Sequence, residues 1–293
     1  MTPRKPDLLF ADLAERAVQY NARASVPDFD ACVREYAELA EVARQRCAAV
    51  RDLYYGMGAA ERLDIFLPTA ARQPAPVFLF IHGGYWRSQT KEDAPIMAPA
   101  FNAAGVAVVP VEYTLLPEGT LAEAVREERS AVAWIYHHAD RYGLDRDRIY
   151  VGGSSAGGHL AGMLAATDWQ DKYRVPGDVV KGVVALSGLF DVRPLCDINV
   201  NEWLRLYPDQ AGRLSPMFSL PRRGLPMIVS VGGLETDGFK NQTAAYEAAC
   251  REAGLEVKRV EAAHCNHFNL LCELAKAESP LTRATLEMIG ASR

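Results

Sequence analysis

The chain has 293 residues, of which 49% are hydrophobic, and a formal net charge of −5. This length suits one large α/β domain or two small ones with a sizeable core. A negative net charge without any basic block argues against nucleic acid and anionic membrane surfaces as partners.

The N-terminal segment MTPRKPDLLFADLAERA lacks the continuous apolar core of a signal peptide, and no later apolar run approaches the roughly 20 residues of a membrane span. We therefore expect a cytoplasmic protein. The six cysteines include no C-x-x-C pair, so neither a disulfide framework nor a zinc knuckle is predicted. We expect them to be ordinary reduced thiols.

The first part of the chain has apolar residues at helical spacing. This pattern runs from about residue 8 to residue 50 and is interrupted at SVPDFD, where Ser25, Pro27 and Asp28 end one helix and start another. The sequence therefore predicts a helical N-terminal arm over residues 1–56. Such an arm can either close over a pocket or build the interface of a homodimer.

Strand and helix patterns alternate after the arm. The expected strands are RLDIFLP, PVFLFIHGG, GVAVVPVEY, RIYVGGSS, GVVALSG, PMIVSVGG and LEVKRVEAA, and the expected helices lie near residues 93–104, 120–142, 156–167, 239–253 and 280–289. Several strands are continuously apolar, as expected when both faces of a sheet are covered. We predict a single domain over residues 1–293, with a mostly parallel, doubly wound sheet flanked by helices. Residues 189–224 are the least regular and are expected to form a lid or loop over a site.

The stretch YVGGSSAGGHL (residues 150–160) contains the pattern G-x-S-x-G. Gly153 and Gly157 flank Ser155 at this spacing, whereas centring the pattern on Ser154 would require a glycine at position 156. A strand pattern precedes the motif and a helical pattern follows it, which is the context of a nucleophile elbow. The spacing predicts Ser155 as a nucleophile, and a plain glycine-rich turn is the simpler alternative.

The sequence favours nucleotide binding and metal binding less than it favours a nucleophilic serine. The glycine-rich stretch lacks the Gly-Lys-Ser/Thr ending of a P-loop and does not match a dinucleotide-binding motif. His264 and His267 have H-x-x-H spacing, but no third ligand at metal spacing accompanies them. We therefore expect no metal and no cofactor.

A second glycine turn, His82-Gly83-Gly84, follows the expected strand PVFLF. Glycines allow backbone N–H groups to point into an open space, where they can stabilise a negatively charged oxygen of a reaction intermediate. We assign this oxyanion hole to the amides of Gly83, Gly84 and Ala156. His82 is expected to be structural.

A nucleophile elbow is followed, along the chain, by an acid and then a histidine after later strands. Glu235 and Asp237 both follow the strand PMIVSVGG, and Asp191 is a less favoured third choice after the preceding strand. His264 and His267 both follow the last strand. We favour His267 as the base, because it lies deeper in the loop.

Together these segments resemble the kynurenine formamidase (arylformamidase) group of α/β-hydrolases, close to the hormone-sensitive-lipase-like esterases. The resemblance is carried by HGGYW, VEYTLLPE, AVAWIYHHADRYGLDRDRIYVGGSSAGGHLAG, VGGLETDGFKNQT and HCNHF, and it covers nearly the whole chain. Lipase-like esterases generally have a third glycine where Tyr85 stands. The pair Tyr85-Trp86 therefore indicates the formamidase side of the group.

The resemblance implies an α/β-hydrolase fold with Ser155 as nucleophile, Glu235 as acid and His267 as base. The family usually has an aspartate as the acid, so the glutamate is a departure and Asp237 stays the alternative. The implied reaction is the cofactor-free hydrolysis of N-formyl-L-kynurenine, or of a related N-acylated aromatic amine, to the amine and formate.

Aromatic side chains are expected to surround the serine and bind an aromatic substrate. They are Tyr85, Trp86, Phe239 and Phe268, of which about half are expected to contact the substrate, the others being core residues. Three other functions stay open. They are a short-chain carboxylesterase, an amidase for longer N-acyl arylamines, and a non-catalytic ligand-binding protein, which would require a damaged triad.

Overall fold

The computed structural model describes residues 7–69 and 74–290, so residues 1–6 of the expected arm, and residues 70–73 and 291–293 of the expected domain, lie outside the described residues. The strands are β1 (Ala48–Tyr54), β2 (Arg62–Leu67), β3 (Ala75–Ile81), β4 (Ala107–Val111), β5 (Leu144–Ser154), β6 (Val180–Leu186), β7 (Met227–Ser230) and β8 (Val257–Arg259). The helices are α1 (Leu13–Gln19), α2 (Phe29–Arg46), α3 (Ala98–Ala103), α4 (Leu121–His138), α5 (Ala156–Ala165), α6 (Trp169–Tyr173), α7 (Asn201–Leu204), α8 (Pro208–Arg213), α9 (Asp237–Glu252), α10 (Asn269–Cys272) and α11 (Pro280–Ile289).

The strands form one sheet in the order β1-β2-β4-β3-β5-β6-β7-β8. Every neighbouring pair from β4 to β8 is parallel, whereas β2 runs antiparallel to both β1 and β4. The predicted mostly parallel sheet is confirmed. No helix in the described part of the chain is long and apolar enough to cross a lipid bilayer.

The expected helical arm is wrong at its C-terminal end. α2 ends at Arg46, the next residue is extended, and residues 48–54 form strand β1. β1 is an edge strand with an irregular register between Val50 and Leu53, and all seven of its residues are partly or fully exposed. Because it has no apolar alternation and directly follows a long helical pattern, its sequence does not distinguish it from that helix.

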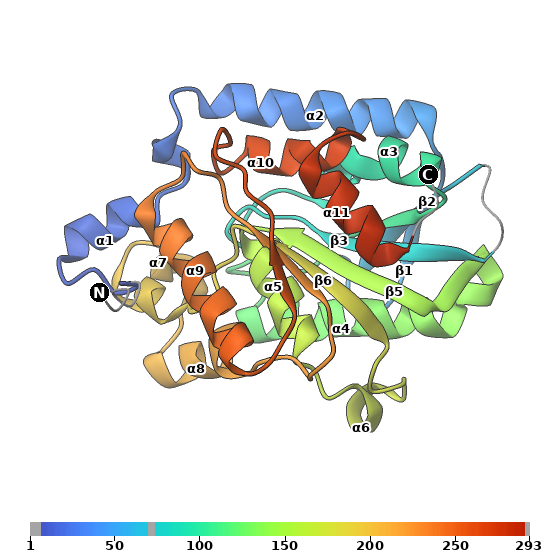
Figure 1. Cartoon of the computed structure of the whole chain (residues 1–293). Helices are drawn as coiled ribbons and strands as arrows, with labels where there is room; N and C mark the ends of the chain where they lie inside the picture. The colour runs from blue at the N-terminus through green and yellow to red at the C-terminus, as the bar shows by residue number, and fades with distance from the viewer. Residues whose placement is uncertain (1–6, 70–73, 291–293) are drawn as a thin grey trace.

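Alternating residues of the central strand β3 pack into two different cores. Val77, Leu79 and Ile81 belong to a cluster shared with α4, α5 and α9, whereas Phe78 and Phe80 belong to a cluster shared with α2, α3 and α11. Figure 1 shows α2, α3 and α11 above the sheet and α4 and α5 below it. Both faces are therefore covered, which explains why this strand is apolar throughout.

One buried carboxyl group in this core has no partner. Glu128 on α4 is fully buried, and neither of its side-chain oxygens has a hydrogen-bond partner among the described residues. Burial raises the pKa of Glu128 well above its ordinary value, and the charges of Glu127 and Glu112 raise it further. The folded chain therefore keeps this group protonated at pH values where the unfolded chain has already lost the proton.

We expect the contribution of Glu128 to stability to decline as the pH rises above about 4.3, the ordinary pKa of glutamate, because only the folded state binds the proton in that range. Glu128→Gln removes this ionisation. The free energy of unfolding of the variant relative to the wild type should therefore increase with pH, by up to about 1.4 kcal/mol per unit. Urea unfolding at several pH values measures the difference. The same trend in Glu38→Gln, at an exposed position of α2, would contradict this explanation.

Candidate active site

Ser155 occupies the sharp turn between β5 and α5. Its φ of +58° lies in the left-handed region, which a residue with a side chain rarely adopts. A Cβ atom at Gly157 would lie 2.1 Å from the carbonyl oxygen of Ile81, and one at Gly153 would lie 2.2 Å from the carbonyl oxygen of Gly157. Only glycine fits at these two positions, so the G-x-S-x-G pattern follows from the close packing of α5 against the strands.

The second glycine turn lies directly beside this serine. A Cβ atom at Gly83 would lie 3.4 Å from the Cβ of Ser155, and Gly84 has a φ of +87° in a turn closed by N–H groups of the following residues. Among the described residues, the backbone N–H groups of Gly83, Gly84 and Ala156 donate to no protein acceptor. Since Ala156 also begins α5, these three donors suit a negatively charged oxygen next to Ser155.

The conformation of this loop is supported by a carboxylate that the sequence analysis missed. Glu112 follows β4, and its Oε1 lies 3.0 Å from Nε2 of His82. The backbone N–H groups of Lys91 and Tyr113 donate to the same carboxylate, and the Tyr113 ring stacks on the His82 ring with centroids 4.4 Å apart. A charged residue at the end of the apolar run GVAVVPV was the available signal.

Glu235 and His267 form a buried pair at the ends of β7 and β8. Nδ1 of His267 lies 2.6 Å from Oε2 of Glu235. The other carboxylate oxygen accepts hydrogen bonds from the Ser187 hydroxyl at 2.6 Å and from the Gly232 N–H at 2.7 Å. The carboxylate is therefore fixed on both oxygens. Ser187 was not predicted from the sequence, where its place directly after the strand GVVAL was the available signal.

The alternative acids and the alternative histidine lie elsewhere. Asp237 is the first residue of α9 and pairs with Lys240 at 2.9 Å, with most of its side chain exposed. Asp191 is buried but pairs with Arg193 at 2.7 Å. His264 has a side chain that is 75% exposed and lies 3.8 Å from a glutamate further along the chain. None of these three contacts the imidazole of His267 in the described residues.

Backbone hydrogen bonds align the serine with this pair. The Ser155 N–H donates to the carbonyl of Leu186 at 2.8 Å, and the Ser187 N–H donates to the carbonyl of Ser230 at 2.9 Å. They continue the ladders between β5, β6 and β7 past the strand ends, so Ser155 and Glu235 lie on the same edge of the sheet. Among the described residues no hydrogen bond joins the Ser155 hydroxyl to His267, and such bonds often form only with substrate.

Comparison with known proteins shows which family this chain belongs to. The family model BD-FAE matches residues 63–203. The kynurenine formamidase of Salmo salar is 32% identical over 94% of this chain and 94% of its own length. The chain belongs to the kynurenine formamidase family.

Two solved structures agree with the fold of this family member. A protein from Silicibacter sp. TM1040, whose assignment as a thioesterase is itself provisional, is 29% identical with a TM-score of 0.80 over 94% of this chain and 99% of its own. The hyperthermophilic esterase of Pyrobaculum calidifontis is 18% identical with a TM-score of 0.71 over 96% of this chain and 94% of its own. The predicted α/β-hydrolase fold is confirmed.

The four aromatic residues predicted to bind substrate in this kynurenine formamidase family member divide into a buried pair and a partly exposed pair. Trp86 and Phe239 are fully buried, and the Phe239 ring packs on His267 with centroids 4.3 Å apart. Tyr85 and Phe268 are partly exposed, and the Phe268 ring lies 5.3 Å from that of His267. Because Trp86 and Phe239 have no accessible surface, they pack the interior beneath the site. We retain only Tyr85 and Phe268 as candidates for substrate contact.

The N-terminal arm of this family member packs against the same edge of the sheet. The Tyr85 hydroxyl donates to the carbonyl of Tyr20, and the Gly238 N–H donates to the side chain of Gln19 at 3.1 Å. On the other side, the indole N–H of Trp203 on α7 donates to the carbonyl of Tyr85 at 3.0 Å. The arm and the segment 189–224 thus both contact the loop that carries the glycine turn.

Proposed function

We propose that this chain hydrolyses N-formyl-L-kynurenine to L-kynurenine and formate, with Ser155 as nucleophile, His267 as base and Glu235 as acid. Similarity to the Salmo salar kynurenine formamidase over nearly the full length of both chains carries the proposal. The 2.6 Å contact between His267 and Glu235, on the sheet edge that also bears Ser155, supports the assignment of roles. We further propose that the enzyme acts on this small molecule in the cytoplasm.

The first half of the proposed reaction forms an acyl-enzyme. His267, oriented by Glu235, takes the proton of the Ser155 hydroxyl, and the serine oxygen attacks the formyl carbon. The carbonyl oxygen becomes negatively charged and accepts hydrogen bonds from the free N–H groups of the two glycine turns. Each such donor typically stabilises the transition state by about 3 kcal/mol.

The second half releases both products. The C–N bond breaks, and His267 donates its proton to the departing arylamine. A water molecule then transfers a proton to His267 and attacks the formyl ester on Ser155. Formate leaves, and the serine oxygen regains its proton from His267.

The aromatic leaving group is proposed to lie against Tyr85 and Phe268. These rings are the partly exposed ones of the four predicted, and offset or edge-to-face contacts between aromatic rings contribute about 0.5–1.5 kcal/mol beyond area burial. The arm and the segment 189–224 are proposed to cover the ring, because both contact the loop of Tyr85.

A short-chain carboxylesterase is the second candidate, favoured by the thioesterase assignment of the similar Silicibacter protein. The same three residues would attack an ester. Values of kcat/KM for N-formylkynurenine, N-acetylkynurenine and p-nitrophenyl acetate separate the candidates. We expect the formyl amide to be turned over best. A preference for the acetyl amide would indicate an amidase for longer acyl groups, and turnover of the ester alone would indicate an esterase.

We expect Ser187→Ala to lower kcat about 10-fold with little change in KM, because the buried Glu235 carboxylate loses a charge-assisted hydrogen bond from a side chain that is itself fully buried. Steady-state kinetics with N-formylkynurenine measures the effect. Ser215→Ala is the control, since Ser215 is also buried, but its hydroxyl donates to the Ala211 carbonyl and accepts from the Val192 N–H. Equal rates in wild type and Ser187→Ala would show that this hydroxyl does not position the acid.

A further inference from the structure

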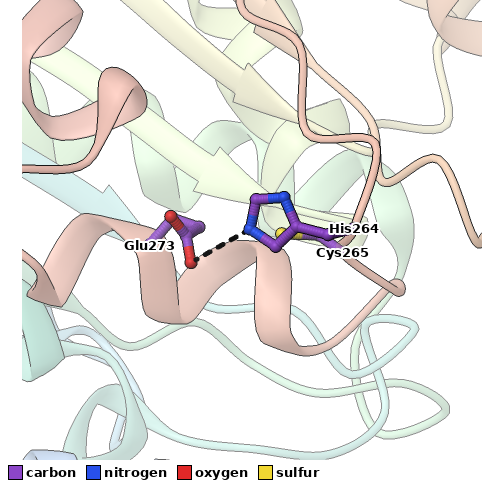
Figure 2. A group of neighbouring side chains, drawn as sticks. All are labelled: His264, Cys265 and Glu273. Carbon is purple, nitrogen blue, oxygen red and sulfur yellow. Dashed lines mark ion pairs between the residues drawn. The ribbon is translucent and has the colours of Figure 1, made fainter.

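Three side chains that have no part in the proposed reaction lie close together, two of them in the loop that also carries His267. His264 and Cys265 lie in the turn after β8, and Glu273 follows α10. Their imidazole nitrogen, thiol sulfur and carboxylate oxygen all lie within 4.8 Å of one another. Figure 2 shows His264 and Glu273 facing each other, with the sulfur of Cys265 beside the imidazole ring.

The chemistry of these donors is that of a zinc site. Zinc binds imidazole nitrogen, thiolate sulfur and carboxylate oxygen at about 2.0–2.3 Å, which places the ligand atoms of a tetrahedral site about 3.5 Å from one another. His264 Nε2 and Glu273 Oε1 are already 3.8 Å apart. Small movements of these side chains, of which that of His264 is 75% exposed, would bring the three donors to these distances, with water as the fourth ligand.

We propose that His264, Cys265 and Glu273 form a binding site for Zn²⁺. This differs from the expectation of no metal, which considered the spacing of His264 and His267 and discounted the cysteine between them. The further ligands come instead from Cys265 and, across the turn, from Glu273. His267 is not part of the group, which among the described residues comprises only His264, Cys265 and Glu273.

The Glu273 carboxylate already has a cationic partner. The Lys276 ammonium lies 2.6 Å from Glu273 Oε1, and 62% of the Lys276 side chain is exposed. The ammonium can therefore move into solvent when a divalent cation takes its place. Burial raises the pKa of the Cys265 thiol to about 11, so zinc binding replaces its proton, which is released to water as the Zn–S bond forms.

A metal at this site would stabilise the loops that carry Glu235 and His267. The Leu234 N–H donates to the carbonyl of Cys265 at 3.0 Å, and a Cβ atom at Gly232 would lie 2.4 Å from the same carbonyl oxygen. The residue after Leu234 is Glu235, so the backbone of Cys265 packs directly against the turn of the acid. A metal bound at Cys265 would therefore connect this turn to α10.

Titration of the chelator-treated full chain with Co²⁺, a spectroscopic substitute for Zn²⁺, tests the proposal. We expect one equivalent to produce the near-ultraviolet charge-transfer band of a cobalt–thiolate bond, and Zn²⁺ to displace it. The band should be absent in Cys265→Ser and present in Cys250→Ser, whose cysteine is also buried and free. No band in the wild type, or a band that persists in Cys265→Ser, would overturn the proposal.

A second variant, His264→Gln, tests the site independently in case Cys265→Ser does not fold. The exposed position of His264 makes His264→Gln safe for folding, and we expect it to weaken Zn²⁺ binding by at least about 10-fold in calorimetric titration. Zn²⁺ should raise the thermal midpoint of the wild type more than that of His264→Gln, since a ligand that binds only the folded state stabilises it. Equal affinities in the two proteins would contradict the site.

Discussion

Ser155→Ala should lower kcat/KM for N-formylkynurenine by at least about 10⁴-fold, because the acyl-enzyme route is lost with the serine oxygen. The fold should persist, since alanine keeps the Cβ atom of the elbow and only the hydroxyl is removed. The measurement is steady-state production of kynurenine by the purified variant, together with its thermal midpoint.

The neighbouring serine provides the matched control for this substitution. Ser154 is also buried, but it is the last residue of β5 and does not occupy the strained turn. Ser154→Ala should retain most of the activity. Loss of activity in Ser154→Ala with activity retained in Ser155→Ala would overturn the assignment of the nucleophile.

Glu235→Gln should lower kcat by about 10³–10⁴-fold. A neutral amide keeps the size of the side chain but no longer fixes the tautomer of His267 or stabilises its cation, and a comparable change in a serine protease has an effect of about 10⁴-fold. KM should change much less, because the Glu235 carboxylate is buried and contacts the imidazole of His267. Rates over a range of N-formylkynurenine concentrations separate the two constants.

Asp237→Asn is the control for the acid. Its carboxylate pairs with Lys240 at the start of α9 and is mostly exposed, so this substitution should change kcat by less than about 2-fold. If Asp237→Asn were the damaging variant and Glu235→Gln the tolerated one, the acid would have been assigned to the wrong residue.

The sequence predicts the elbow well because the two glycines that it requires each lie two residues from Ser155. The close packing that requires glycine at positions 153 and 157 involves the residues next to Ser155 and the neighbouring strand, so it leaves a short pattern with fixed spacing. The choice between Glu235 and Asp237 was open on the residues alone, because it depends on where α9 begins. That boundary directs Asp237 outward to Lys240 and leaves Glu235 in the turn before the helix.

Contacts between distant segments could not be predicted in the same way. Ser187 and Glu235 are 48 residues apart, and His82 and Glu112 are 30 residues apart, so no local spacing connects them. The burial of the four aromatic candidates could not be predicted from the sequence either. Trp86 and Phe239 carry the residue types of a substrate pocket, but only the packing of the helices on the sheet shows that both are fully buried.

The direct test of the proposed function is to incubate the purified full chain with N-formyl-L-kynurenine and to quantify both products. We predict formate and kynurenine in equal amounts, at a rate proportional to enzyme concentration and abolished by Ser155→Ala. Hydrolysis of p-nitrophenyl acetate without any formate release from N-formylkynurenine would contradict the proposed function while leaving a serine esterase.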